Sequence, residues 1–469
     1  MHKIRTIDDL PSPKGTPIVG NLPKFNAENK HQVLEEWVKE VGDVFKISLM
    51  GKKFIVSADP DINHEILKNR PDQFRRFAKI DEIMSEMDII GVFNAEGEQW
   101  RIHRKLTSEA LNLKNVQNFL PTLQRVAERL HERWNVFSEK QAVIDVQKEM
   151  VRYTVDITTD IAFGYDINTL QKENDVIQDH MEKVFPMINQ RITAPIPLWR
   201  YYKSKKDKAF DQAIAAVVKV VHEFIDKAKL RLNENPDLRE NPSNFLEALL
   251  VEQDKEGSIS DKEIFGNVFT ILLAGEDTTS NSISWTLYYL TQHPEVVQKL
   301  RAEADTTFTG ICPSTNEELA AMRYTEAVAM ESIRLKPVTP NLYLQALEDV
   351  TINDLFIKKG MTVMMQNKVA QTDDKYFTHG ESFIPERWIP KACPMHTSHS
   401  PQSIRTFGAG PRFCPGRNLA VHEMKMALSM IYKNFDVTLE VKPEEVKESF
   451  AFTMFPKNLK VKLLPRNTD

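Results

Sequence analysis

A lone thiol lies in an irregular, glycine-rich loop near the C-terminal end of the chain. The stretch FGAGPRFCPG, residues 407–416, holds Cys414 just before a segment with a helical pattern. Pro415 suits the first position of that helix, whose dipole and free amides lower the pKa of a nearby thiol. Arg412 adds positive charge two residues away. The loop therefore favours an anionic sulfur as a metal ligand; a nucleophile also fits, but it needs a base, and the nearest histidine is His422.

The longest predicted helix carries two carboxylates and two hydroxyls at its centre. The pattern predicts this helix over residues 261–292, opening with a capping box of Ser260 and Glu263 and ending before a His-Pro pair. The stretch VFTILLAG, residues 268–275, is apolar on every side, so the helix is expected to cross the protein interior. The centre then reads AGEDTT over residues 274–279.

Two interpretations of these central residues remain open. In the first, the helix reaches the surface and the carboxylates of Glu276 and Asp277 face water, which is the commoner situation for acidic residues. In the second, the helix centre borders a cavity. Gly275 then leaves room for a ligand, Thr278 donates a hydrogen bond and Asp277 passes protons inward.

An acid and two arginines are spaced for a buried network. Glu331 and Arg334 lie three residues apart, so they share a helix face, and Arg387 follows in the stretch FIPERW. A carboxylate held between two guanidinium groups forms a fully bonded cluster. Such a clamp fixes the geometry of loops and does no chemistry itself.

Composition restricts the class of protein. The chain has 469 residues and a formal net charge of −5, which argues against a nucleic-acid binder because such proteins carry a basic excess. No segment approaches the ~18 consecutive apolar residues of a membrane span, and the N-terminus has no signal-peptide core. Three cysteines do not make a disulfide framework. We expect a soluble, cytoplasmic protein with no membrane anchor.

The surrounding pattern is mostly helical. A hairpin is predicted from Val44 around a turn at Gly51, followed by a short helix from Asp59-Pro60, and residues 100–292 read as helix. Short β-like runs follow Pro337 and close the chain. Since no repeat or linker interrupts the sequence, we expect one mainly α domain over residues 1–469, a large helical domain with a minor β-sheet portion.

The motifs resemble those of the cytochrome P450 family, in the family's order and over nearly the whole chain. The loop matches the haem-binding signature F-G-x-G-x-R-x-C-x-G, and three further motifs look like the family's W-x-x-x-R, A-G-x-[DE]-T-[TS] and E-x-x-R elements. The matching residues are Phe407, Gly408, Gly410, Arg412, Cys414 and Gly416; Trp100 and Arg104; residues 274–279; and Glu331 and Arg334, with Arg387 as partner.

The resemblance implies a cofactor, haem b, and a role for each motif. Cys414 is expected to be the proximal thiolate of the iron, with Phe407 and Gly416 in its loop and Ala274 beside the haem. Asp277 and Thr278 are expected to deliver protons for O2 activation. The residues expected to hold the haem propionates are Trp100, Arg104 and Arg412.

The resemblance also implies a pocket and a partner. The pocket candidates are mostly apolar, so a lipophilic substrate is expected: Phe77, Met84, Met87, Phe93, Leu273, Ala274, Thr339, Asn341, Met454 and Phe455. The chain carries no flavin or iron–sulfur domain, so a separate ferredoxin- or flavodoxin-type donor is expected. A basic docking patch and ordinary solvated side chains are equally good interpretations of Arg101, Lys105, Arg417 and Lys425.

Several positions depart from the pattern or carry no role. Gln345 stands where many relatives have a propionate-binding arginine, and Gln371 opens a stretch where many have His-Arg-Asp-Pro, so propionate anchoring is expected to be lighter. The run CPMHTSH, with Cys393, His396 and His399, is expected to be a polar surface loop because its spacing matches no familiar zinc site. Cys312 is expected to be a loop thiol.

These observations predict a haem-thiolate monooxygenase that inserts one oxygen atom from O2 into a lipophilic small molecule. A peroxide-driven haem-thiolate peroxygenase is a second enzyme interpretation, which an acid–threonine relay disfavours. A haem-binding sensor or electron carrier is the non-catalytic interpretation, in which such a relay has no purpose. The sequence names neither the substrate nor the native electron donor.

Overall fold

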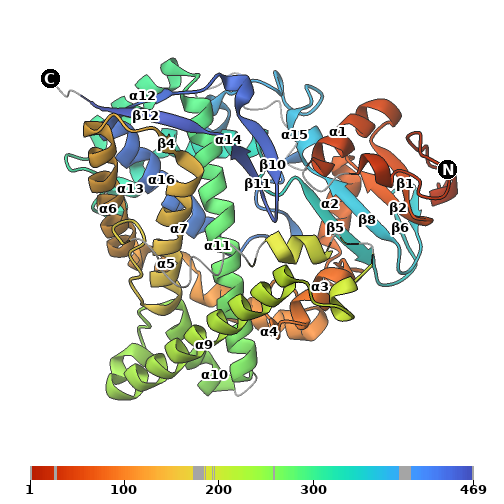
Figure 1. Cartoon of the computed structure of the whole chain (residues 1–469), viewed down its shortest axis with the longest axis horizontal. Helices are drawn as coiled ribbons and strands as arrows, with labels where there is room; N and C mark the ends of the chain where they lie inside the picture. Colours follow the sequence, from red (N-terminus) through yellow and green to blue (C-terminus); the bar gives the residue numbers. More distant parts are fainter. Residues whose placement is uncertain are drawn as a thin grey trace. The chain divides into compact units, whose positions relative to one another are not determined.

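The computed structural model describes residues 3–25, 29–172, 184, 186–192, 194, 196–256, 259–389 and 403–466. The chain forms two compact units. The first comprises residues up to 81, 330–414 and 448–454, and the second comprises residues 82–329, 415–447 and 455 onward. Helices dominate and the sheets are small, so the predicted mainly α fold is confirmed (Figure 1).

The first unit contains a five-stranded sheet. Only β2 and β8 pair in parallel, and the other neighbours pair antiparallel. The first two strands form the predicted hairpin, whose turn places Met50 and Gly51 at φ 50° and 80°. Positive φ at both central residues matches the twist of a tight hairpin. The strand order is β1 (Val44–Leu49), β2 (Lys52–Ser57), β8 (Thr362–Gln366), β5 (Asn341–Ala346) and β3 (Phe74–Arg76).

Two helices of the first unit pack on this sheet. The apolar stripe of α1 (Lys30–Val41) buries Leu34 and Trp37 among strand residues. The second helix, α2 (Pro60–Lys68), begins where predicted, because the Asp59 side chain accepts hydrogen bonds from two amides of its first turn. The smaller elements are β6 (Val350–Ile352), β7 (Leu355–Ile357) and α15 (Lys368–Thr372), whereas β10 (Lys447–Phe450) and its partner β11 (Met454–Lys457) cross the chain boundaries of the units.

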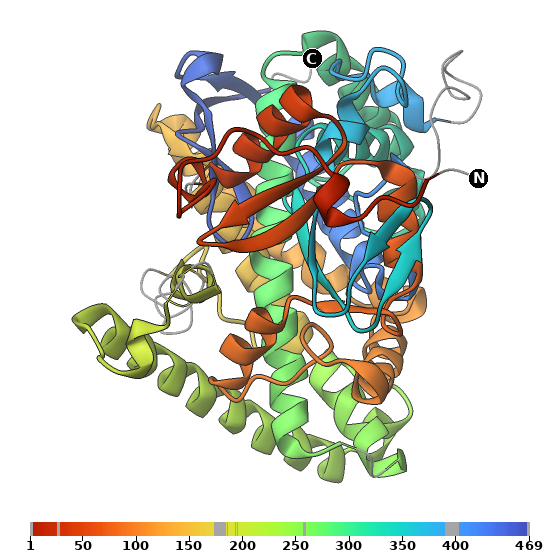
Figure 2. The same ribbon diagram turned by 90° about the vertical axis from the view of Figure 1, so that its right-hand side faces the viewer.

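The second unit is built on α11 (Asp261–Leu290) and α7 (Val146–Phe163). The predicted capping box of Ser260 and Glu263 is present, and α11 ends two residues before the expected boundary. Both helices are buried along most of their length, and α11 runs through Figures 1 and 2 as one unbroken green helix. A helix that is apolar on every side is enclosed by its neighbours.

Shorter elements surround this pair. A three-stranded sheet has the order β4 (Ile144–Asp145), β12 (Lys460–Pro465) and β9 (Phe435–Leu439), which confirms the predicted last strand. The helices are α4 (Gly97–Ala110), α5 (Leu113–Asn118), α6 (Leu120–Glu139), α9 (Lys205–Glu234), α10 (Phe245–Glu256), α12 (Pro294–Thr307), α13 (Asn316–Ala321) and α16 (Arg417–Asn434). Two more, α3 (Ala78–Ser85) and α14 (Arg323–Leu335), cross the boundaries between the units.

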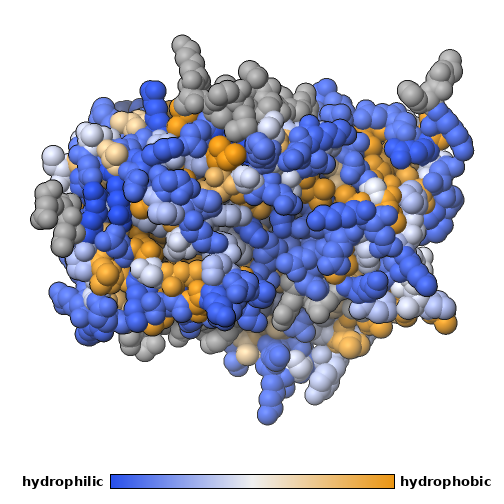
Figure 3. Space-filling view, turned by 90° about the horizontal axis from the view of Figure 1, so that it is seen from above, coloured by the Kyte–Doolittle hydropathy of each residue, from blue (hydrophilic) through white to orange (hydrophobic). Residues whose placement is uncertain are grey.

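None of the helices in the described ranges has the length and apolar character that a membrane crossing requires. On the face seen in Figure 3, hydrophilic residues prevail and hydrophobic ones lie in separate small groups. Single exposed hydrophobic residues are normal on a protein surface.

Candidate haem site

The Cys414 loop is held tightly against α2 of the first unit. Gly408 and Gly410 have φ values of 75° and 67°, a conformation that side-chain-bearing residues rarely adopt. A Cβ at Gly410 would lie 2.2 Å from the carbonyl oxygen of Leu67, so the close approach of the loop also requires glycine. The backbone N–H of Cys414 donates to the carbonyl of Phe407 at 2.9 Å and closes the loop. This backbone holds the half-buried thiol in a defined place.

The helix after the thiol begins later than predicted. α16 starts at Arg417, and Gly416 caps it with φ −84° and ψ 8°. Pro415 is therefore a turn residue, and the expectation that it occupies the first helical position is wrong. The glycine dihedrals belong to a turn, so the first helical turn forms only after it. Cys414 precedes the helix by three residues, and the dipole acts on it from farther away than expected.

Two further haem-binding candidates lie on one face of α4 in the second unit. Trp100 is buried and Arg104, one helical turn later, is half-buried. An indole N–H and a guanidinium are both donors. Their common face suits an acidic group.

The centre of α11 presents an accessible face within a buried helix. Residues 264–273 and 279–287 are buried, whereas Ala274, Gly275, Asp277 and Thr278 keep partial exposure. Ala274, Asp277 and Thr278 have the spacing of one helix face. The Thr278 hydroxyl donates to the Ala274 carbonyl at 2.6 Å.

The two central carboxyl groups differ in their surroundings. Glu276 is buried, and its backbone carbonyl accepts a hydrogen bond from Thr154 of α7 at 3.0 Å, so the interpretation that it faces water is wrong. Asp277 is half-buried, and desolvation raises the pKa of its carboxyl group to about 6. An acid with this pKa exchanges protons near neutral pH.

Gly275 serves helix packing rather than a ligand. A Cβ at this position would lie 2.9 Å from both Cγ2 and Oγ1 of Thr158 on α7. The expectation that Gly275 leaves room for a ligand is therefore wrong, because the missing side chain lets α7 approach α11 closely.

The clamp residues are brought together in the first unit, all of them fully buried. The Glu331 carboxylate accepts from Nη2 and Nε of Arg334 at 2.7 and 2.8 Å and from Nε of Arg387 at 3.1 Å. It also accepts from the Ile384 amide at 3.0 Å and the Trp388 indole at 2.9 Å. Arg334 and Arg387 donate in turn to the carbonyls of Gly380, Ser382 and His379. One carboxylate thus organises the chain over residues 379–388.

Sequence reasoning missed the role of Gln371. This fully buried side chain donates to the carbonyl of Arg334 at 3.3 Å and accepts from the amide of Arg405 at 2.9 Å. Its own carbonyl accepts from the Arg334 guanidinium. Gln371 therefore joins the clamp to the chain that enters the Cys414 loop. In the sequence, only the departure of Gln371 from the family pattern indicated that this position has a distinct role.

The pocket candidates divide between the two units. Phe77, Thr339, Asn341 and Met454 belong to the first, and Met84, Met87, Phe93, Leu273, Ala274 and Phe455 to the second. Fully buried side chains are those of Met84, Leu273 and Met454, whereas Asn341 and Met87 are nearly buried. Partial or full exposure remains at Phe77, Phe93, Ala274, Thr339 and Phe455.

The predicted basic patch is smaller than expected. Lys425 is 4% exposed and pairs with Glu326 at 3.1 Å, so its inclusion in an open patch is wrong. Its position on the buried side of α16 favours this ion pair with the more exposed Glu326 over full solvation. The side chains of Arg101, Lys105 and Arg417 are exposed.

The remaining sequence candidates carry no chemistry in the described part of the chain. Cys312 is buried, and burial raises the pKa of its thiol to about 12. Gln345 donates to the carbonyl of Gly360 at 2.9 Å. The run with Cys393, His396 and His399 lies outside the described residues. The described ranges hold no cluster of three or more metal-binding side chains.

Each unit, taken by itself, contains residues whose chemistry fits a haem. The Cys414 loop offers a thiol in a segment without carboxylates, and Arg412 offers a cation beside it. Trp100 and Arg104 offer donors for an acidic group, and α11 offers an accessible acid–hydroxyl pair. A thiolate ligand, donors for propionates and a polar oxygen-side face are what a haem-thiolate centre requires.

Comparison with known proteins decides the family. Residues 10–463 match the family described as Cytochrome P450. The chain belongs to the cytochrome P450 family. The predicted resemblance is confirmed, and so is the predicted enzyme class, because cytochrome P450 monooxygenases are haem-dependent oxidoreductases.

Relatives of this cytochrome P450 occur in distant organisms. Protein lutein deficient 5, chloroplastic, of Arabidopsis thaliana is 26% identical over 96% of this chain and 76% of its own length. Cytochrome P450 3A7 of Homo sapiens is 26% identical over 91% of this chain and 85% of its own. The self-sufficient cytochrome P450 monooxygenase CYP505E3 of Phanerodontia chrysosporium is 25% identical over 97% of this chain, which spans only 43% of that protein.

Proposed function

We propose that this cytochrome P450 inserts one oxygen atom from O2 into a lipophilic small molecule, by hydroxylation or epoxidation, with electrons from a separate redox protein. The observation that carries the proposal is the centre of α11. Within the buried middle of this helix, the accessible residues include an acid with a pKa of about 6 and a threonine. An enzyme that consumes protons on an enclosed cofactor needs such a pair.

The cofactor is proposed to be haem b, which would be held by Cys414 and by donors from Trp100, Arg104 and Arg412. When bound through a thiolate, haem supplies O2 binding and O–O cleavage. Cys414 keeps its place through the loop hydrogen bond to Phe407 and the two left-handed glycines. The clamp and Gln371 hold the chain that leads into this loop.

Asp277 and Thr278 are proposed to move protons. The raised pKa lets the Asp277 carboxyl both hold and release a proton near neutral pH. Thr278 donates to the Ala274 carbonyl and so holds its hydroxyl oxygen at the accessible face, available as an acceptor. A proton on Asp277 can reach this oxygen along the same helix face.

Replacement of Thr278 by alanine tests the proposal. The variant loses the hydroxyl and keeps the helix, because alanine is the best helix former. We expect electron consumption to continue while product formation falls about 10-fold or more, in the range of lost proton-transfer catalysis. The measurement is the ratio of product to reduced nicotinamide consumed, in wild type and in the control Thr306→Ala on the exposed face of α12. Equal coupling in Thr278→Ala and wild type refutes the relay.

The partner and location are also proposals. A separate redox protein as electron donor stays a proposal, and one relative of this chain carries the word self-sufficient in its name. A ferredoxin- or flavodoxin-type protein and a cytoplasmic location remain predictions, as does the single domain over residues 1–469. Turnover with peroxide alone, at the rate reached with a reductase, would favour the peroxygenase alternative instead.

A further inference from the structure

Lys30 is a buried cation in the first unit. Its side chain is 4% exposed at the start of α1. Its Nζ lies 4.5 Å from the ring centroid of Phe450 and 5.9 Å from that of Tyr343. Burial lowers the pKa of Lys30 to about 8, and no acidic residue acts on it in return among the described residues. At neutral pH it stays charged, and a buried charge without an opposite charge is costly.

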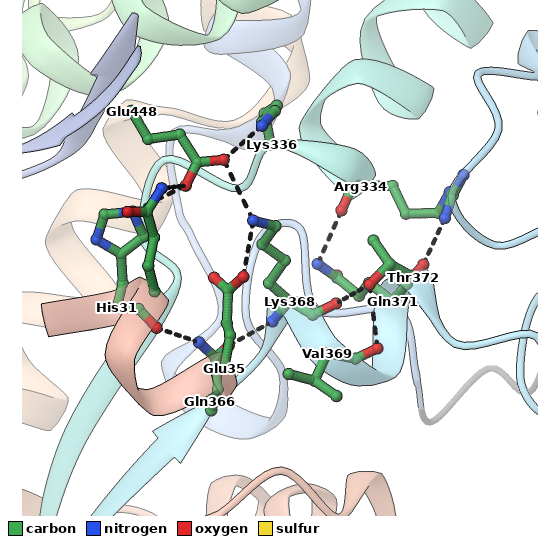
Figure 4. A network of polar contacts seen from close by, with 11 residues as sticks. His31, Glu35, Arg334, Lys336, Gln366, Lys368, Val369, Gln371, Thr372 and Glu448 are labelled. Atoms are coloured by element: carbon green, nitrogen blue, oxygen red, sulfur yellow. Dashed lines mark hydrogen bonds and ion pairs between the residues drawn. The ribbon is translucent and has the colours of Figure 1, made fainter. Parts of the chain in front are cut away.

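The neighbouring charged groups leave this cation uncompensated. The carboxylate of Glu448 accepts hydrogen bonds from the ammonium groups of Lys336 and Lys368, the latter at 3.2 Å, and Glu35 accepts from Lys368 at 2.9 Å (Figure 4). These two carboxylates therefore balance these two lysines. Lys30 adds a further positive charge, for which the described residues supply only aromatic rings.

Two buried polar groups lie on β5, the strand whose Tyr343 ring lies near the Lys30 ammonium. Asn341 and Tyr343 are two residues apart on β5, so their side chains share one face of the sheet. Asn341 is 7% exposed, and apart from a weak contact between the two side chains themselves, no described residue gives its amide atoms or the Tyr343 hydroxyl a hydrogen bond. The two side chains are neighbours all the same, because the amide opposes the burial that raises the Tyr343 pKa. Buried polar groups normally have partners.

Apolar side chains adjoin this polar cluster. The turn between β10 and β11 packs beside the start of β5, where the Met454 N–H donates to the carbonyl of Val338 at 2.8 Å. Met454 is fully buried, and Phe450 covers the Lys30 ammonium. Met454 and Asn341 are both predicted pocket residues. The cluster therefore combines donors and one cation with an apolar border.

We propose that Lys30, Asn341 and Tyr343 bind the carboxylate of a lipophilic acid substrate. A carboxylate has about four acceptor sites and no donor, whereas an ammonium, an amide N–H and a phenol O–H all donate. It also supplies the negative charge that the cluster lacks, in charge-assisted hydrogen bonds. The proposal rests on the oxygenase function and names its substrate class as long-chain or similarly apolar carboxylic acids.

Matched ligand pairs test the proposal on the haem-loaded protein. Calorimetry measures the affinity of fatty acids of 8 to 16 carbons and of the alcohols with the same chains. Spin-state titration follows the same ligands at the haem. We expect wild type to prefer the acid over its alcohol about 10-fold or more, as for a buried charge-assisted contact. Lys30→Met abolishes this preference and leaves the alcohol affinity within about twofold.

Controls separate charge, fold and function. Lys375→Met removes an exposed lysine that also lies over an aromatic ring, and it should keep the preference for acids. Lys30→Arg keeps a cation at this position, so it should retain part of the preference for acids that Lys30→Met loses. Equal affinity for acids and alcohols in wild type, no acid binding, or equal effects of Lys30→Met and Lys375→Met overturn the inference. If thiolate-bound haem is seen in the same samples, the proposed function survives that result; its absence in wild type defeats both.

Discussion

Replacement of Glu331 by glutamine measures how strongly the clamp holds the first unit. The carboxylate accepts five hydrogen bonds, four from side chains and one from a backbone amide, and it is fully buried. Glutamine keeps the shape but removes the charge, so two guanidinium groups that are 1% exposed lose their counter-charge. Breaking a buried ion pair in this way costs about 3–5 kcal/mol of unfolding free energy.

Asp354→Asn in the same unit is the matched control. Asp354 pairs with Arg5 at 2.6 Å, but both side chains are about one-third exposed. Such exposed pairs contribute about 0–1 kcal/mol. Urea unfolding of both variants, with haem content measured in parallel, should show a loss at least about 2 kcal/mol larger for Glu331→Gln, together with poor haem retention. Similar losses in the two variants would refute the reasoning that burial makes the clamp strong.

Two further predictions concern α11. Because burial raises the Asp277 pKa to about 6, the folded protein holds a proton between about pH 4 and pH 6 that the unfolded chain has released. The unfolding free energy contributed by this group therefore falls as pH rises through that window. Asp277→Asn should remove this fall in denaturation curves recorded from pH 4 to pH 7. Identical pH profiles in wild type and variant would contradict the raised pKa. Gly275→Ala gains about 1 kcal/mol of helix propensity but meets Thr158 at 2.9 Å, and overpacking costs about 1–3 kcal/mol. The melting temperature should therefore fall in the parent chain and rise when Gly275→Ala is made in a Thr158→Ala background, and a rise in both backgrounds would show that the contact is unimportant.

Local signals predicted the parts of the fold that depend on neighbouring residues. The Ser260–Glu263 capping box placed the start of α11, and Asp59 placed the start of α2. The clamp was predictable because Glu331 and Arg334 share a helix face and because the stretch FIPERW supplies Arg387 as a third member. Such interactions can be recognised because their partners lie within a few residues of each other or belong to a recurring motif.

Tertiary contacts explain what sequence reasoning missed. The neighbour that makes Gly275 necessary is Thr158, more than a hundred residues away. The partner that buries Lys425 is Glu326 on another helix. Lys30 begins an ordinary amphipathic helix, and only the packing of β5 and β10 reveals it as an uncompensated cation. No spacing rule in one sequence identifies these partners.

The absorption spectrum of the reduced, carbon-monoxide-bound protein shows whether Cys414 ligates the haem iron as a thiolate. It is recorded for purified wild type and for Cys414→Ser, with circular dichroism to confirm that both fold. We expect a strongly red-shifted Soret band in wild type that is lost in the variant, because the band requires a thiolate ligand. A folded, haem-loaded wild type without that band, or a variant that keeps it, would contradict the assignment of Cys414 as the haem ligand.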